Sequence, residues 1–152
     1  TLAEAAGVAG MCGGQALDIA ATGQRQSLAD LETMHALKTG ALIRAAVRMG
    51  GLAADADEAL LARLDDFASA LGLAFQIRDD ILDVEASSEQ LGKTAGKDIA
   101  QDKSTYPALL GMDHSKRLLG ELAERMSAAL SPLDDRAEPL RVLGRLAIAR
   151  NH

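Results

Sequence analysis

Apolar residues recur along the chain at intervals of three and four, the spacing of one face of an α-helix. Leucine, alanine, arginine and glutamate dominate and runs of β-branched residues are absent, so the pattern predicts an all-α fold without strands. The chain has no repeat, linker or low-complexity tract, and we expect residues 1–152 to lie in a single domain. The expected helices cover residues 2–21, 28–49, 55–85, 107–111, 113–130 and 134–150, with a polar loop at 86–104.

Glycines and capping residues indicate helix ends and close contacts. Ser27 can cap the second expected helix, and Gly50 and Gly51 are typical of its end. Glycines lower helix propensity but let a neighbouring backbone approach closely, so the glycine-rich first helix is expected to pack tightly. Its glycines are Gly7, Gly10, Gly13 and Gly14.

The expected helix 28–49 carries a lysine, Lys38, on its apolar face. The residues that share this face are Leu31, His35, Lys38, Leu42, Ala45 and Met49. A buried, unpaired ammonium costs free energy, so Lys38 must reach solvent, pair with a carboxylate or meet an anionic ligand. We interpret His35 as a hydrogen-bonded core or rim histidine.

Three aspartates, Asp79, Asp80 and Asp83, lie near the end of the expected helix 55–85. Carboxylates at a helix C-terminus oppose the macrodipole and repel one another when they are one turn apart. Magnesium would remove both penalties, because it binds few protein carboxylates and completes its shell with water and phosphate oxygens. The alternative is a solvated acidic helix end. The predicted apolar stripe contains Leu64, Ala68, Leu71, Phe75, Asp79 and Leu82, with Gln76, Asp80 and Asp83 at its edge.

Two further groups of polar residues accompany the aspartates. The loop that follows contains Lys93, Lys97 and Lys103. These lysines either belong to a basic surface loop or fold over the aspartates and bind the opposite side of a diphosphate. Gln15 and Asp18 are one turn apart in the first expected helix. They either form hydrogen bonds between helices or line a site.

Composition excludes several classes of function. The chain has 22 acidic and 16 basic residues and a net charge of -6, so it lacks the basic surface typical of nucleic-acid binding. Its single cysteine, Cys12, cannot form an internal disulfide, and no secretory signal pattern is present, so we expect a cytoplasmic protein. No apolar run reaches the roughly 18 to 20 residues that span a bilayer, so no stable membrane insertion is expected.

Four segments together resemble the trans-isoprenyl diphosphate synthases, or polyprenyl synthetases, most closely the bacterial farnesyl diphosphate synthases. The resemblance covers most of the chain from Met11 to Gly111, in the order of the family. It implies an all-α, isoprenoid-synthase-type helical bundle around a central cavity, usually in a homodimer. The segments are GMCGGQALDIA, HALKTGALIRAAVRMGG, GLAFQIRDDILDV and LGKTAGKDIAQDKSTYPALLG.

The resemblance also implies roles for particular residues. Asp79, Asp80 and Asp83 correspond to the second aspartate-rich motif of the family, where Asp79 and Asp83 are the expected Mg²⁺ contacts. The remaining residues correspond to positions along the substrates. Lys38, Thr39 and Gln76 match residues near the allylic substrate and its developing cation, Lys93 and Lys103 match diphosphate contacts, and Gln15 and Asp18 match residues that line the site.

The chemistry implied by the resemblance is condensation of isopentenyl diphosphate with an allylic diphosphate, dimethylallyl or geranyl, to give farnesyl diphosphate. Magnesium assists ionisation of the allylic substrate by neutralising the leaving pyrophosphate, and an apolar cavity keeps water from the cation. A product of different length, geranyl or geranylgeranyl diphosphate, is an alternative.

The sequence departs from the family because the first aspartate-rich motif is absent. We therefore expect the chain to be the C-terminal portion of a synthase domain, and a polypeptide of these residues alone to be inactive. The alternatives are a non-catalytic helical subunit that modulates a partner synthase and a terpene cyclase. The presence of Lys38, Thr39, Gln76, Lys93 and the aspartates favours an enzyme over such a subunit, and the KTG context is rare in cyclases.

Overall fold

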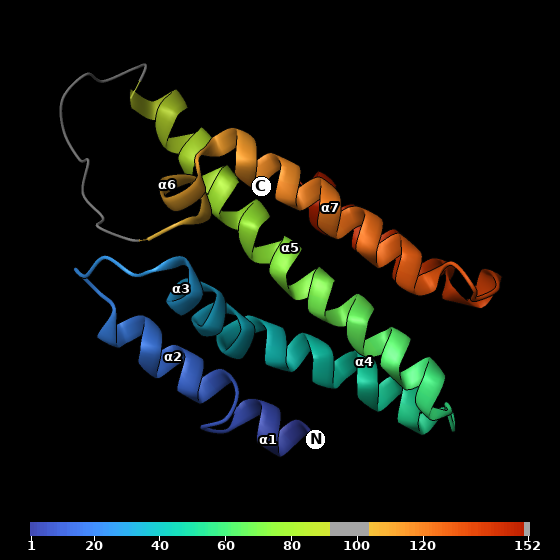
Figure 1. Ribbon diagram of the computed structural model, residues 1–152. Coiled ribbons are helices and arrows are strands. Elements are labelled where there is room, and N and C mark those ends of the chain that lie inside the picture. Colours follow the sequence, from blue (N-terminus) through green and yellow to red (C-terminus); the bar gives the residue numbers. More distant parts are fainter. Residues whose placement is uncertain (92–103, 151–152) are drawn as a thin grey trace.

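The computed structural model describes residues 1–91 and 104–150, with side chains described for 1–86 and 104–150. Within these residues the chain is helical and contains no strand, which confirms the all-α prediction (Figure 1). The elements are α1 (Leu2–Ala6), α2 (Met11–Ala20), α3 (Leu28–His35), the π-helical turn η1 (Ala36–Gly40), α4 (Ala41–Ala53), α5 (Glu58–Leu91), α6 (Tyr106–Leu110), α7 (Met112–Leu130), the 3₁₀ turn η2 (Asp135–Ala137) and α8 (Glu138–Ala149).

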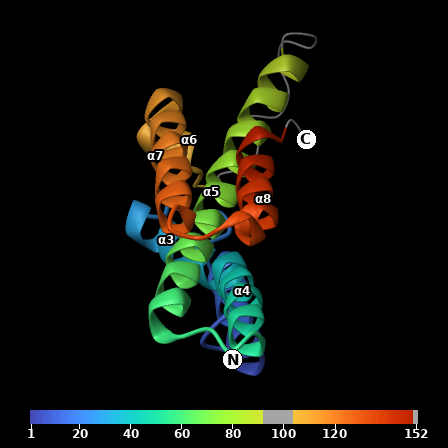
Figure 2. The ribbon, with the colours of Figure 1, turned by 90° about the vertical axis from the view of Figure 1, so that its right-hand side faces the viewer.

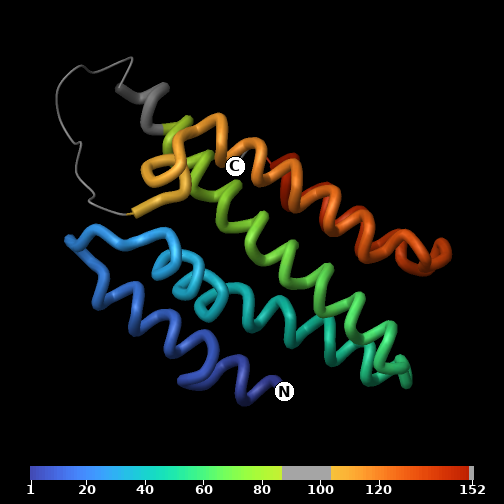
Figure 3. Tube along the Cα trace, viewed as in Figure 1, coloured from blue at the N-terminus to red at the C-terminus, as the bar shows by residue number. Residues whose placement is uncertain are grey.

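The long helix α5 is the centre of the molecule. Helices α3 and α4, joined by η1, run along one side of α5, and α1 and α2 lie outside them (Figures 1 and 3). Helix α7 packs on another side of α5, and α8 contacts both α5 and α7 (Figure 2). The core between these helices contains fully buried Phe67, Ile77, Ile81, Leu130 and Tyr106. Each such side chain contributes about 1.5 to 3 kcal/mol relative to solvent exposure.

Several helix boundaries differ from the sequence prediction. The expected first helix is interrupted between α1 and α2, where Gly7 and Gly10 lie in a turn. A Cβ atom at Gly10 would lie 2.1 Å from the carbonyl oxygen of Ala5, so this turn requires glycine. Gly50 and Gly51 do not end the second helix, because α4 continues to Ala53 and Gly51 is buried against α5.

Other boundaries agree with the prediction. Ser27 caps α3 in a capping box, in which Ser27 Oγ accepts from the Asp30 amide at 3.2 Å. The short helix α6 ends at Gly111, whose φ of 83° suits glycine and lets the chain turn into α7. At the C-terminal end of α7, the Arg141 guanidinium donates to the carbonyl oxygens of Leu130 and Leu133, which attaches α8 to that helix.

Two glycines place the backbone of η1 directly against its neighbours. A Cβ atom at Gly14 in α2 would lie 2.2 Å from the amide nitrogen of Lys38. On the α5 side, a Cβ atom at Gly72 would lie 3.1 Å from Cα of Gly40. The predicted close approach of the first helix is therefore confirmed at Gly14, and η1 is held between α2 and α5.

The predicted apolar stripe of α5 was correct only in its first half. Leu64, Ala68 and Leu71 are buried, but Phe75 and Leu82 are only half-buried and Asp79 is exposed. In the second half the buried positions are instead Ala74, Ile77 and Ile81. The face changes because α5 contacts α4 and η1 as well as α7 and α8, so burial does not follow one stripe. No helix in the described part of the chain is long and apolar enough to cross a membrane.

Candidate active site

A cavity of about 160 Å³ lies between α2, α3, η1, α5 and the segment that leads into α6. It brings together six of the residues predicted for the site, which come from three separate helical segments. These residues are Asp18, Lys38, Gln76, Asp79, Asp80 and Asp83.

Lys38 is presented to the cavity by the π-helical turn η1. Such turns are rare and often occur at functional sites, because the wider turn displaces side chains from the regular helical face. Lys38 Nζ donates to Asp18 Oδ2 at 2.6 Å, and the lysine side chain is 35% exposed. Of the three possibilities that the sequence left open for this lysine, pairing with a carboxylate is the one observed.

Asp79 faces the C-terminal end of the described chain. Arg150 Nη2 donates to Asp79 Oδ1 at 2.6 Å and to the carbonyl oxygen of Phe75 at 3.1 Å. The guanidinium carbon also lies 4.1 Å from the centroid of the Phe75 ring, a cation–π contact. The exposed carboxylate of Asp79 therefore has a cationic partner within the chain.

Asp80 anchors the segment that leads into α6. Its Oδ2 accepts from the amide of Tyr106 at 2.9 Å. Ser104 Oγ, two residues earlier, accepts from the amide of Gln26 at 2.8 Å. The chain entering α6 is thus bound to both α5 and the loop between α2 and α3.

Asp83 and Gln76 complete the α5 wall of the cavity. Asp83 is exposed and lies one turn beyond Asp79, and Gln76 is half-buried one turn before Asp80. Among the described residues, no group of three histidine, cysteine, aspartate or glutamate side chains is arranged to hold a metal ion by itself. The aspartates form an open carboxylate surface and not a closed metal cage.

His35 lines the inner side of the cavity and is a buried residue, only 8% exposed. Burial, followed by the nearby ammonium of Lys38, lowers the pKa of His35 from 6.5 to about 4. Its ring centroid is 5.7 Å from that of Tyr106. Burial raises the pKa of Tyr106, and the carboxylates of Glu32 and Asp80 raise it further. The interpretation of His35 as a core histidine is confirmed, although its Nδ1 atom has no hydrogen-bond partner among the described residues.

Two other predicted site residues that the structure describes, Gln15 and Thr39, do not line the cavity. Gln15 is exposed on α2, and Thr39 follows Lys38 in η1. Lys93 and Lys103, like Lys97, lie outside the described residues.

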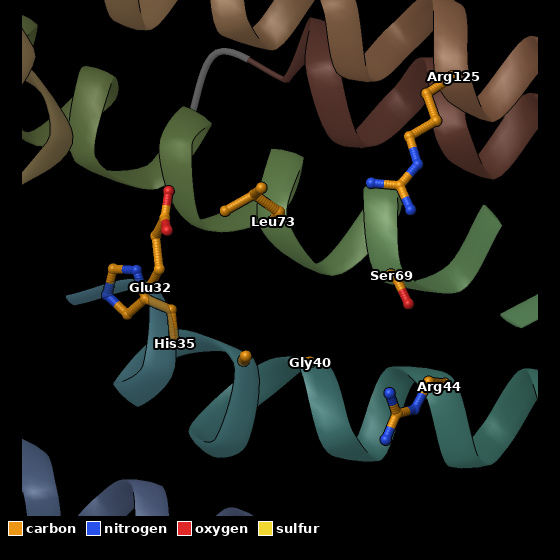
Figure 4. A pocket seen from close by; sticks show the side chains of 8 residues that line it. Glu32, His35, Gly40, Arg44, Ser69, Leu73 and Arg125 are labelled. Carbon is orange, nitrogen blue, oxygen red and sulfur yellow. The ribbon is translucent and has the colours of Figure 1, made fainter. Parts of the chain in front are cut away.

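A second cavity, of about 270 Å³, lies between α3, η1, α4, α5 and α7. Figure 4 shows Arg44 on α4 and Arg125 on α7 at one end and Glu32 and His35 at the other. Arg125 is paired with Asp66. His35 lines both cavities and so separates them, but none of the residues predicted for catalysis lines the second one.

A sequence profile of the polyprenyl synthetase family matches residues 2–135. The chain belongs to this family. It is 48% identical over 147 residues to the farnesyl diphosphate synthase of Escherichia coli, an alignment that covers 96% of this chain and 49% of that protein. It is 42% identical over 151 residues to the farnesyl diphosphate synthase of Geobacillus stearothermophilus, covering 99% of this chain and 51% of that protein.

Solved structures have the same fold. A putative farnesyl-diphosphate synthase from Marinomonas sp. MED121 superposes with a TM-score of 0.83 at 41% identity. That comparison covers 95% of this chain and 49% of the Marinomonas chain. This polyprenyl synthetase chain therefore spans about half the length of the relatives it matches.

Sequence reasoning missed two residues that shape this polyprenyl synthetase site. The sequence assigns no role to Arg150, and Tyr106 appears only within one of the family segments. Both act through contacts between distant positions, since Arg150 is 71 residues from Asp79 and Tyr106 is 26 residues from Asp80. The sequence offers only one indication for Arg150, which is its positive charge at the end of an expected helix.

Proposed function

We propose that the protein containing this chain is a magnesium-dependent prenyltransferase that condenses isopentenyl diphosphate with dimethylallyl or geranyl diphosphate to give farnesyl diphosphate. The observation that carries the proposal is the cavity itself, which Lys38 lines together with three carboxylates of α5. Its similarity to bacterial proteins named farnesyl diphosphate synthase supports this product length.

The exposed aspartates fit magnesium bound together with a diphosphate. Magnesium prefers hard oxygen ligands and commonly uses one or two carboxylates plus water and phosphate oxygens. Asp79 and Asp83, one turn apart on the cavity wall, offer such a pair, because both are exposed, whereas Asp80 is half-buried and accepts a hydrogen bond from the amide of Tyr106. We therefore assign the metal contacts to Asp79 and Asp83 and an anchoring role to Asp80. When bound, magnesium would neutralise charge on the leaving diphosphate.

We assign Lys38 and Gln76 to the allylic substrate, and their position in the cavity lining supports this assignment. The Lys38 ammonium can stabilise the diphosphate as the allylic C–O bond breaks and the electron pair leaves with the phosphate oxygen. The Gln76 side-chain oxygen is a neutral dipole that can face the developing carbocation without reacting with it. Asp18 holds Lys38 in place, and Thr39 would support the same turn.

The new carbon–carbon bond needs little acid–base chemistry from the protein. The double bond of isopentenyl diphosphate attacks the allylic cation, and one proton is then lost, which the departing pyrophosphate can accept. His35 is not the base we propose, because it is buried and its Nδ1 atom has no hydrogen-bond partner among the described residues. The main task of the surrounding helices is to keep water away from the cation.

We further propose that residues 1–152 form the C-terminal portion of a single helical synthase domain, and that the first aspartate-rich motif belongs to the remainder of that domain. The chain matches only about half the length of its relatives, which supports this division. Lys93 and Lys103 would bind diphosphate and Gln15 would line the completed cavity. A homodimer and a cytoplasmic location remain part of the proposal.

The test is an incorporation assay on the protein at its natural length. Labelled isopentenyl diphosphate is supplied with dimethylallyl diphosphate and magnesium, and the dephosphorylated products are separated by chain length. We expect farnesol as the main product. A product of geranyl or geranylgeranyl length would contradict the proposed chain length, and no incorporation would contradict prenyl transfer.

A further inference from the structure

Arg150 makes a set of contacts with α5 that the reaction above does not use. Its Nη2 atom donates to Asp79 Oδ1 at 2.6 Å and to the Phe75 carbonyl oxygen at 3.1 Å, and its guanidinium stacks on the Phe75 ring. The backbone of Arg150 is held as well, because Arg78 Nε donates to the carbonyl oxygen of Arg150 at 2.9 Å. Both the side chain and the backbone of Arg150 are therefore fixed to one turn of α5.

This arrangement places a protein cation on a carboxylate proposed to bind a metal cation. The Asp79 side chain is 52% exposed, whereas that of Arg150 is 23% exposed, so the arginine lies beneath an accessible carboxylate. Arg150 occupies Oδ1 of Asp79, and a divalent cation on either oxygen of this carboxylate would lie close to the guanidinium, where the two cations repel each other. Arg150 must then lose at least part of its contact when a metal ion binds Asp79.

We propose that Arg150 is a competing counter-ion for Asp79, and that a divalent cation at Asp79 displaces the Arg150 side chain and loosens the C-terminal end of α8. This inference rests on the proposed function, because it assumes that Asp79 holds a cation. The hydrogen bond from Arg78 to the carbonyl oxygen of Arg150 does not involve the displaced side chain, so it can keep Arg150 close to the site and let the pair re-form when the cation leaves. Residues 146–150 would consequently be ordered most firmly in the metal-free protein.

The competition is measured by titrating Mn²⁺ into the protein at its natural length and following free Mn²⁺ by electron paramagnetic resonance. Arg150→Gln removes the competitor and should tighten Mn²⁺ binding by roughly threefold to tenfold, the range expected for one ion pair plus one cation–π contact. Arg150→Lys keeps the charge but loses the planar stacking and should lie between the two.

The matched control is Arg145→Gln, which removes one positive charge from α8, the helix that Arg150 directly follows. Arg145 pairs with Glu138 at 2.5 Å and makes no contact with Asp79. It should leave Mn²⁺ affinity unchanged within about twofold, which separates local competition from the general effect of losing one positive charge. Equal affinities in wild type and Arg150→Gln, or weaker binding in Arg150→Gln, would overturn the inference.

A second measurement uses the wild-type protein and avoids any loss of folding in a variant. Hydrogen exchange at the amides of residues 147–150 should become faster on addition of Mn²⁺, and unchanged exchange at saturating Mn²⁺ would overturn the inference. Asp79→Asn separates the two proposals. If it leaves Mn²⁺ affinity unchanged, the proposed metal contact itself fails; if it weakens binding while Arg150→Gln binds as wild type does, only the competition fails.

Discussion

Lys38 lines the cavity together with the aspartates of α5. Its ion pair with Asp18 fixes the position of its ammonium group. Lys38→Gln removes a charged donor aimed at the diphosphate and should lower kcat by about 100-fold. Asp18→Asn keeps Lys38 but removes the ion pair that positions its ammonium group, so the expected loss of kcat is smaller, about tenfold. Steady-state rates of prenyl transfer measure both effects.

Arg63→Gln is the control for these variants, because Arg63 is an exposed residue of α5 that does not line the cavity. Its kcat should equal that of the wild type. A Lys38→Gln protein with an undiminished kcat would show that the cavity does not bind the reacting diphosphate through this lysine.

His35 should make the stability of the protein depend on pH. Its pKa is about 4 in the folded protein and near 6.5 in the unfolded chain, so between these values the unfolded chain binds a proton that the folded protein lacks. The stability contribution is therefore fully present above pH 6.5 and is lost as the pH falls toward 4. The loss between pH 7 and pH 5 should be about 2 kcal/mol in the free energy of unfolding.

Urea unfolding at these two pH values, compared between wild type and His35→Gln, isolates this contribution from those of other groups. His35→Gln should show a pH dependence smaller by about 2 kcal/mol. His114→Gln changes an exposed histidine and should retain the wild-type difference. Identical pH dependence in wild type and His35→Gln would contradict the assigned pKa.

Single residues also show what the sequence could reveal about the site. The patch of Asp79, Asp80 and Asp83 followed from helical spacing, because residues three and four apart share a helix face. Their different partners did not follow, because Arg150 and Tyr106 reach them only through the tertiary fold. Local spacing thus identified the carboxylates but not which of them is free to bind a ligand.

Among the helices, the contact between α2 and η1 places Asp18 beside Lys38. Gly14→Ala would put a methyl group 2.2 Å from the Lys38 amide nitrogen, and that neighbour is backbone, which cannot rotate away. The helices must separate, and we expect a loss of about 1 to 3 kcal/mol in unfolding free energy together with a lower kcat. Chemical denaturation and the prenyl-transfer assay give the two readouts.

Gly50→Ala is the matched control on another helix. Gly50 lies within α4, and a Cβ atom added there would have no atom within 4 Å. Alanine has less conformational freedom than glycine in the unfolded chain and favours the helix, so Gly50→Ala should raise the free energy of unfolding by about 0.5 to 1 kcal/mol. Equal stabilities of the Gly14→Ala and Gly50→Ala proteins would contradict the close packing of α2 on η1.

The helices themselves were largely predictable, since apolar spacing and caps such as Ser27 are local signals. The interruption at Gly7 to Gly10 and the π turn at Lys38 were not, because each depends on how neighbouring backbones pack. The stripe on α5 failed beyond Leu71 for the same reason: a helix covered on several sides has no single apolar face.

For the whole molecule, the central proposal is that this cavity forms one wall of a magnesium-dependent prenyl-transfer site. The chain matches about half of the length of its relatives, and the family's first aspartate-rich motif is not in its sequence. We therefore expect a polypeptide of residues 1–152 alone to be inactive, while the protein at its natural length transfers prenyl groups.

The most direct test is the magnesium-dependent rate of isopentenyl incorporation by Asp83→Asn at natural length. Asp83 is an exposed carboxylate on the cavity wall, and Asp113→Asn, on the exposed first turn of α7, provides the matched control. We predict that Asp83→Asn lowers kcat by about 100-fold or more and raises the magnesium concentration needed for half-maximal rate, while the control keeps both values. Wild-type kcat and magnesium dependence in Asp83→Asn would contradict the account.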